Sequence, residues 1–152
     1  MVGILNFRIW VKGCMTVKKQ KSNKSLGLMD DKYGIELILD LHGCDASKFT
    51  RKSISEYFEE LCILINMQRE ELHFWDDIGV PDDEKQTSPH TQGTSAVQFI
   101  LTSSIVIHTL DQLEAVYINI FSCKEYDPKI AENFSVEWFS AKNYSARFID
   151  RV

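Results

Sequence analysis

The chain has 152 residues, of which 44% are hydrophobic and 11% aromatic, a composition that fits one folded domain and argues against disorder. Its 17 lysines and arginines against 22 aspartates and glutamates give a net charge of -5, which argues against nucleic acid as a partner. No apolar run approaches the roughly 20 residues that cross a membrane. The four cysteines show no CxxC spacing, so we expect reduced thiols in a cytoplasmic protein rather than a zinc site or a disulfide scaffold.

The first 30 residues differ from the rest. The stretch 1–11 is apolar but broken by Asn6 and Arg8, and no basic region precedes it as in a signal peptide. A basic, polar tract follows over 18–25, which would suit a flexible, solvated extension or, alternatively, a contact with nucleic acid or an acidic surface. We predict that residues 1–30 are an extension dispensable for chemistry and that residues 31–152 form the folded domain.

The first half of this domain predicts strand, helix, strand and loop. The segment 35–41 has the composition of a strand. The segment 53–65 carries its apolar residues on one helical face, with Ser53 placed as the N-cap. The segment 71–75 is a candidate second strand, and 79–93 is rich in proline, glycine and charge, as loops are.

Residues with reactive side chains then lie in or beside three predicted strands over 97–101, 105–107 and 115–121. They are two hydroxyls, an imidazole and a thiol: Ser95, Ser103, His108 and Cys123. Neighbouring strands could bring all four together at one end of a sheet, as a nucleophile, a base and a proton donor.

The C-terminal part predicts one more helix and one more strand. Asp127 and Pro128 are a good helix start, and a helix to about residue 140 would bury its apolar side chains, namely Ile130, Ala131, Phe134 and Trp138. The segment 144–149 reads as a closing strand. The expected fold is α+β: a two-layer sandwich of a mostly antiparallel sheet with helices packed on one face.

Each of the four chemistry-bearing residues also has an ordinary structural interpretation. Ser103 alone would be a polar strand position, His108 a hydrogen-bonded strand histidine, Cys123 a small buried side chain and Ser95 a turn residue. Their common register with the surrounding motifs favours the functional interpretation.

Those motifs resemble the S-adenosylmethionine decarboxylase family of the short prokaryotic, pyruvoyl-dependent type. The family's Q-G-x-S, E-S-H-x-x-I-H-T and F-T-C segments match residues 92–95, 102–109 and 121–123 without a gap. Upstream, residues 41–45 match its L-x-G-C-D turn. The resemblance covers roughly residues 33–150 and identifies the predicted domain as a pyruvoyl-dependent decarboxylase-like domain.

The resemblance implies a chain that is made as a zymogen and cleaves itself between Thr102 and Ser103. Ser103 would become a pyruvoyl group, the only cofactor, with no metal, and would form a Schiff base with the α-amino group of a small-molecule substrate. His108 and Ser95 would assist self-cleavage, and Cys123 would return a proton after carbon dioxide leaves. The product would be decarboxylated S-adenosylmethionine for spermidine synthesis. The resemblance also implies a homodimer in which both chains shape the pocket.

The sequence departs from the family pattern at several positions: the H-x-F-x-P segment before Q-G is missing, T-W-P-E reads T-L-D-Q over 109–112, and three single replacements bear on the chemistry. Thr102 replaces a glutamate, Ser104 replaces a histidine, and Gln112 stands where a glutamate binds the ribose hydroxyls. An amide still hydrogen-bonds a hydroxyl, without the strength of a charged acceptor. Phe74 or Trp75 could stack on the adenine, or could simply pack in the core.

Two alternatives therefore stay open. The acidic residues Asp76 and Asp77 would suit a basic substrate, as in a pyruvoyl-dependent arginine or ornithine decarboxylase, or would simply lie in a solvated turn. Thr102 and Ser104 beside the nucleophile would also suit an unprocessed, non-catalytic relative that binds a ligand or a partner.

Overall fold

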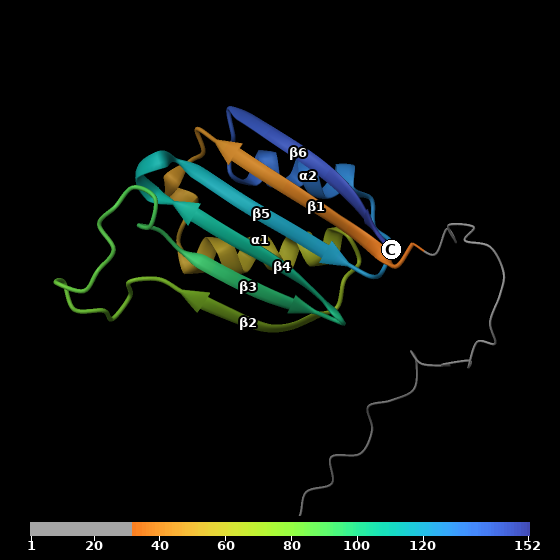
Figure 1. Cartoon of the computed structure of the whole chain (residues 1–152), viewed down its shortest axis with the longest axis horizontal. Helices are drawn as coiled ribbons and strands as arrows, with labels where there is room; N and C mark the ends of the chain where they lie inside the picture. Colours follow the sequence, from red (N-terminus) through yellow and green to blue (C-terminus); the bar gives the residue numbers. More distant parts are fainter. Residues whose placement is uncertain (1–31) are drawn as a thin grey trace, which may run out of the picture.

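The computed structural model describes residues 32–152, and the extension predicted for residues 1–30 lies outside them (Figure 1). Six strands form one sheet: β1 Gly34–His42, β2 Arg69–Trp75, β3 Ser95–Ile100, β4 Ser103–Leu110, β5 Ala115–Ser122 and β6 Asn143–Arg151. Two α-helices, α1 Arg51–Leu64 and α2 Pro128–Trp138, and two short 3₁₀ turns, Ala46–Lys48 and Asp111–Leu113, complete the described part.

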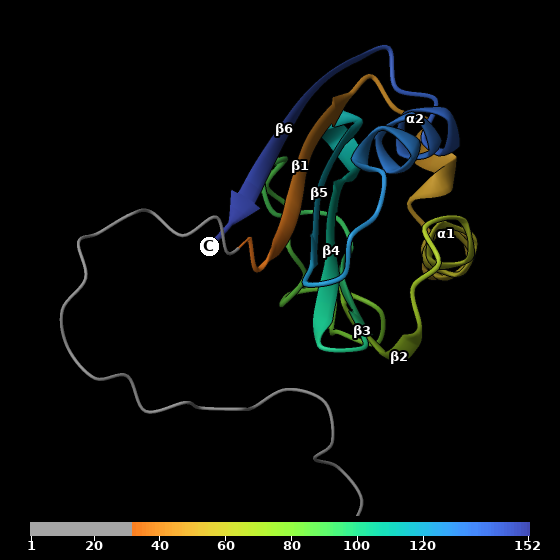
Figure 2. The ribbon, with the colours of Figure 1, turned by 90° about the vertical axis from the view of Figure 1, so that its right-hand side faces the viewer.

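The strands are ordered β2-β3-β4-β5-β1-β6, and every neighbouring pair is antiparallel. Both helices lie on the same face of the sheet, and the other face is open (Figure 2). The predicted two-layer α+β sandwich is therefore confirmed, and each predicted strand is present with bounds shifted by a few residues.

The helices begin where capping side chains satisfy free backbone N–H groups. The side chain of Asp127 accepts hydrogen bonds from the N–H groups of Lys129 and Ile130, as predicted for α2. The prediction for α1 was wrong by one turn, because Thr50 is its N-cap and accepts from the N–H of Ser53 at 3.2 Å. The Ser53 hydroxyl is buried without a hydrogen-bond partner.

The core lies between the helices and one face of the sheet. Alternate residues of the central strands are fully buried there, among them Leu37, Leu39 and Leu41 of β1. On α2, Ala131 is buried and Phe134 and Trp138 pack against the core, but Ile130 is 43% exposed. That part of the prediction was wrong, because the buried face of α2 is formed by Ala131, Glu132 and Ser135 and does not include Ile130.

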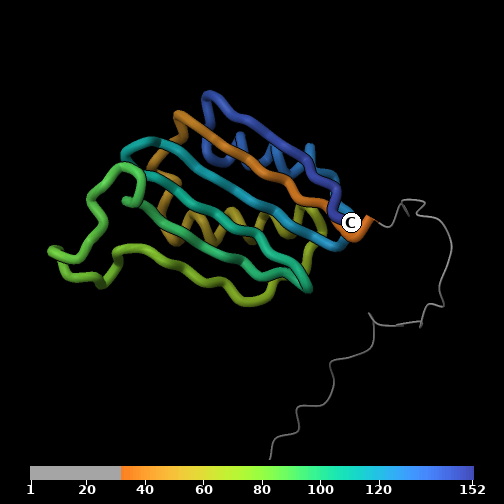
Figure 3. Tube along the Cα trace, in the orientation of Figure 1, coloured from red at the N-terminus to blue at the C-terminus, as the bar shows by residue number. Residues whose placement is uncertain are grey.

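The two ends of the sheet carry different connections (Figure 3). At one end, β3 and β4 are joined by a two-residue turn, Leu101 and Thr102, and β5 finishes beside this turn. At the opposite end lie the long segment 76–94 and the short 3₁₀ turn between β4 and β5. No helix within residues 32–152 is long and apolar enough to cross a membrane.

Candidate active site

The first cluster of predicted site residues lies at the β3–β4 turn. Ser103 is the first residue of β4, and Cys123 follows the last residue of β5, the strand that pairs with β4. The Cys123 N–H donates to Ser103 Oγ at 3.1 Å, and Ser103 Oγ donates to the Cys123 Sγ at 3.7 Å. Both side chains are half-buried. The predicted nucleophile and proton donor are therefore in direct contact.

Thr102, the predicted residue before the cut, belongs to the same cluster. Its Oγ1 lies 3.0 Å from Cys123 Sγ and 2.7 Å from the carbonyl oxygen of Leu101, so its one proton can serve either acceptor. Its φ is 61°, in the left-handed region that disfavours side chains branched at Cβ. The peptide bond between residues 102 and 103 thus follows a strained residue.

Hydrogen bonds make the Cys123 thiol more acidic than the other described cysteines. The Thr102 hydroxyl, and to a lesser extent the Ser103 hydroxyl, lower the pKa of Cys123 because they stabilise its thiolate. Burial instead raises the pKa of Cys44 and of Cys62, each to about 11. Among residues 32–152, Cys123 is accordingly the free thiol best suited to exchange a proton.

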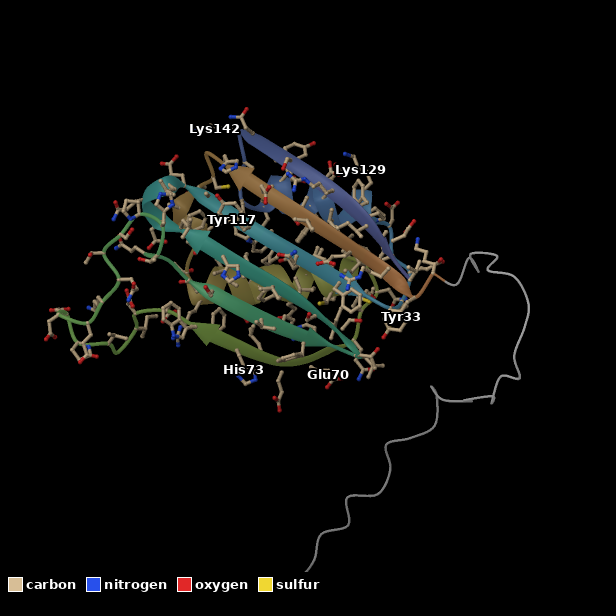
Figure 4. The ribbon with its side chains drawn as sticks, in the orientation of Figure 1. Tyr33, Glu70, His73, Tyr117, Lys129 and Lys142 are labelled. Carbon is tan, nitrogen blue, oxygen red and sulfur yellow. The ribbon has the colours of Figure 1, made fainter. Side chains whose placement is uncertain are left out.

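The second cluster lies at the other end of β3 and β4. Ser95 opens β3 and is directly opposite His108 of β4, and the Ser95 hydroxyl shares a 2.8 Å hydrogen bond with His108 Nδ1. The pair lines an open hollow of about 450 Å³ together with Trp75 and Tyr117. Figure 4 shows Tyr117 on the open face of the sheet. The hollow is thus part of that open face.

The expectation that all four residues meet at one sheet end was wrong for a single chain. Ser103 and His108 lie five residues apart on one strand, so about 17 Å separates them. The β3–β4 register places Ser95 opposite His108, at the end of the hairpin away from its turn. One chain therefore holds two half-sites, the serine–thiol pair and the serine–imidazole pair.

The predicted substrate-binding residues lie near the Ser95–His108 pair, with one exception. Gln112 follows β4 and donates to Gln92 Oε1 at 2.5 Å, and Trp75 is 61% exposed and paired with Ser95. Phe74 lies on the other face, packed against the core under the guanidinium of Arg51. Phe74 therefore packs in the core, whereas Trp75 is exposed and its contact with an adenine stays a prediction.

The acidic pair is already engaged within the chain. Asp76 accepts two hydrogen bonds of 2.6 Å from Arg51, which lowers the pKa of this carboxyl. Asp77 accepts from the N–H of Gln86 at 2.8 Å. Sequence reasoning missed Arg51, 25 residues upstream, because nothing local in the sequence marks this pairing.

Tyr117 is a further residue that the sequence analysis did not single out. It pairs with His108 across β4 and β5 and lines the same hollow. The sequence shows only that Tyr117 lies in the strand 115–121. That it lies beside His108 becomes clear only from the register of β4 and β5. In residues 32–152, no group of three or more His, Cys, Asp or Glu side chains is arranged to hold a metal ion.

An α+β sandwich that holds a serine against a thiol and another serine against an imidazole has the residue types of an enzyme site, because such pairs can supply a nucleophile and a base. The model of the S-adenosylmethionine decarboxylase family matches residues 35–152. The chain therefore belongs to the S-adenosylmethionine decarboxylase family.

Individual relatives agree with this assignment. The chain is 27% identical over 123 residues to an S-adenosylmethionine decarboxylase proenzyme of Clostridium kluyveri, covering 80% of this chain and 88% of the relative. It is 28% identical over 120 residues to the proenzyme of Acetivibrio thermocellus, covering 78% and 87%. The crystal structure of the adenosylmethionine decarboxylase from Aquifex aeolicus shares the fold, with a TM-score of 0.64 and 20% identity over 79% of this chain and 91% of that one.

Proposed function

We propose that this protein is a self-processing, pyruvoyl-dependent decarboxylase that converts S-adenosylmethionine to decarboxylated S-adenosylmethionine, the aminopropyl donor for spermidine synthesis. The chain would cut itself between Thr102 and Ser103. The observation that carries the proposal is the contact of Ser103 with Cys123 at the β3–β4 turn. A family relative that had lost this chemistry would have no need to hold a hydroxyl nucleophile against a thiol at the matching position.

Ser103 would play two parts. Its Oγ, oriented by the N–H of Cys123 at 3.1 Å, would attack the carbonyl carbon of Thr102 and so replace the peptide bond by an ester. Elimination and hydrolysis would then leave a pyruvoyl group at the new N-terminus of β4. The residues fit this group, because the position is half-buried and Cys123 lies beside it. Once formed, the pyruvoyl carbonyl supplies the electron sink for decarboxylation.

Cys123 and His108 would move the protons. Cys123 would deliver its thiol proton to the substrate carbon that has lost carbon dioxide. His108, oriented by Ser95 at 2.8 Å, would take protons during self-cleavage, as the family resemblance implies. In one chain, however, the imidazole is about 17 Å from Ser103, too far for a direct transfer.

A homodimer would resolve this separation. An isologous twofold contact through the open sheet faces, with the two sheets running in opposite directions, would bring the Ser95–His108 pair of one chain to the β3–β4 turn of its partner, where Ser103 and Cys123 lie. The open face fits such a contact, because it carries half-buried apolar side chains that no helix covers, such as Ile38, Val97 and Val106.

The adenosyl substrate is favoured by the Ser95–His108 hollow. The exposed ring of Trp75 offers a stacking surface for a planar base, and Gln112 lies at the same end of the sheet with an amide able to bind ribose hydroxyls. A basic amino acid is the weaker candidate, because Arg51 already neutralises Asp76. The described cysteines are free thiols, which fits a reducing cytoplasm.

An intact mass spectrum of the denatured protein tests the proposal. Self-cleavage predicts two fragments, residues 1–102 and residues 103–152 with a pyruvoyl terminus. The cleaved protein should then release carbon dioxide from S-adenosylmethionine and not from arginine or ornithine. A single full-length mass after long incubation would instead favour the non-catalytic relative, and release from arginine or ornithine alone would favour the basic substrate.

A further inference from the structure

The β3–β4 turn is fixed from three sides. The N–H of Leu101 donates to the carbonyl of Gln68 at 3.0 Å, which anchors the first turn residue to the residue before β2. Thr102 contacts the Cys123 thiol through its hydroxyl at 3.0 Å. Ser103 accepts from the N–H of Cys123 at 3.1 Å. These contacts leave the turn little room to relax.

The backbone conformation that these contacts impose on Thr102 is unfavourable for a threonine. Four non-glycine residues within 32–152 have a positive φ, and Thr102 is the β-branched one among them. Its Cβ methyl and hydroxyl crowd the neighbouring carbonyls in the left-handed region, so a threonine adopts this conformation only when its surroundings impose it. Asn66, another of the four, belongs to a type that tolerates this region.

We propose that Thr102 is a positioning residue for self-cleavage: the Cys123 thiol holds its hydroxyl and so keeps residue 102 in a strained conformation that the cleavage reaction releases. The inference rests on the proposed function and adds a role for a side chain at which this chain departs from its family. Thr102 would act through its backbone, by holding the carbonyl carbon that Ser103 attacks.

The steps of self-cleavage explain how the strain at Thr102 would be released. Ser103 Oγ bonds to the Thr102 carbonyl carbon, the bond from this carbon to the Ser103 nitrogen breaks, and the hydroxyl proton ends on the freed amine. The link from the Thr102 carbonyl carbon to Ser103 Cα then runs through Oγ and Cβ instead of one nitrogen, so the tight turn gains one atom. Loss of the Ser103 Cα proton and cleavage of the Cβ–Oγ bond next free Thr102 as a carboxylate. Water finally converts the remaining dehydroalanine to a pyruvoyl group, with loss of ammonia.

Three substitutions of Thr102 distinguish the contribution of its hydroxyl from the contribution of its backbone strain. Thr102→Ser keeps the hydroxyl but loses the methyl branch and part of the strain, so we expect it to cleave at a rate between those of the wild type and the other two variants. Thr102→Val keeps the branched shape but loses the contact with Cys123, and Thr102→Asn tolerates a positive φ without strain. We expect both to cleave about tenfold more slowly than wild type, in time courses followed by intact mass.

A second measurement tests the strain without any cleavage. In chains that also carry Ser103→Ala and so stay whole, Thr102→Asn should raise the melting temperature by a few degrees relative to Ser103→Ala alone. Wild-type rates for both Thr102→Val and Thr102→Asn would overturn the inference while leaving self-cleavage established, as would an unchanged or lower melting temperature for the Asn variant. A wild-type chain that never cleaves would instead defeat the proposed function, and the inference with it.

Discussion

At the scale of single residues, the chemistry depends on what surrounds one thiol. Cys44 and Cys62 are buried in the core, and their pKa is raised, whereas Cys123 lies at the end of a strand among hydroxyl donors that lower its pKa. The same thiol group is therefore hard to ionise at two positions and more acidic at the third.

Replacing Cys123 by serine separates the two stages of the proposed reaction. A hydroxyl keeps the hydrogen bonds to Thr102 and Ser103, so we expect Cys123→Ser to cleave itself. It gives up its proton far less readily than a thiol, so decarboxylation per cleaved chain should fall by about 10²-fold or more. Cleavage by mass and carbon dioxide release, measured on the same sample, check this. Full decarboxylation by the cleaved variant would remove Cys123 from the role of proton donor.

The lowered pKa of Cys123 gives a signed pH dependence. An alkylating reagent reacts with the thiolate and not with the thiol. In the uncut Ser103→Ala chain, the alkylation rate of Cys123 should therefore rise with pH, with a midpoint below the ~8.5 of an ordinary cysteine. Adding Thr102→Val should move this midpoint upward, because the largest hydrogen bond to the thiolate is lost. Decarboxylation, which in this proposal needs the protonated thiol, should fall as pH rises through the pKa that Cys123 has in the cleaved chain.

Peptide mapping by mass spectrometry assigns the alkylation to Cys123 and distinguishes it from Cys14, which lies outside the described residues. Identical midpoints with and without the Thr102 hydroxyl would show that this contact does not tune the thiol.

At the scale of elements, the tertiary structure of helix α1 decides which of two candidate residues is its N-cap. Thr50 and Ser53 are both residue types that cap helices, and the sequence favoured Ser53 through its spacing to Glu56. In the fold, Ser53 is buried on the first turn with its hydroxyl unpaired, and Thr50 accepts the hydrogen bond of the free N–H. The helix therefore begins where the chain leaves the short 3₁₀ turn, one turn earlier than predicted.

The two candidate caps give opposite expectations when replaced by alanine. Thr50→Ala should lower the free energy of unfolding by about 1 kcal/mol, because it leaves a helix N–H without an acceptor. Ser53→Ala should be neutral or slightly stabilising, because it removes a buried hydroxyl that has no partner. Denaturant unfolding at one fixed protein concentration compares them, because the stability of the proposed homodimer would depend on concentration. If Ser53→Ala lowered the free energy of unfolding more than Thr50→Ala, Ser53 would be the N-cap of α1.

At the scale of the whole molecule, the site is divided between the two ends of one sheet. The serine–thiol pair and the serine–imidazole pair are each complete within a chain, but about 17 Å apart along β4. The open face that would join them to a second copy is free of helices (Figure 2).

Mixed dimers test this division directly. Neither Ser103→Ala nor His108→Ala should cleave itself alone, the first for lack of a nucleophile and the second for lack of a base. Produced together in one cell, they should form dimers in which one site combines an intact Ser103 with an intact His108 from the partner. Mass spectrometry should then find the His108→Ala chain cleaved and the Ser103→Ala chain whole. A His108→Ala chain that stays whole in the mixture would show that the half-sites are not shared.

How far each feature could be predicted follows from how local its cause is. The strands and helices were predictable because their signals are local: alternating apolar residues such as Leu37, Leu39 and Leu41, and the Asp127–Pro128 helix start. The family was predictable from short motifs in fixed spacing, which the match over residues 35–152 bears out.

The tertiary structure alone decided which of the chemistry-bearing residues meet. In an antiparallel pair, each step forward on one strand is a step back on its neighbour, so the position of the β3–β4 turn sets Ser95 against His108. The next pairing carries Cys123 back to the turn, beside Thr102 and Ser103. The sequence by itself determined the elements and the reactive residues, because those signals are local. Strand register divided these residues into two half-sites, because it depends on contacts between distant parts of the chain.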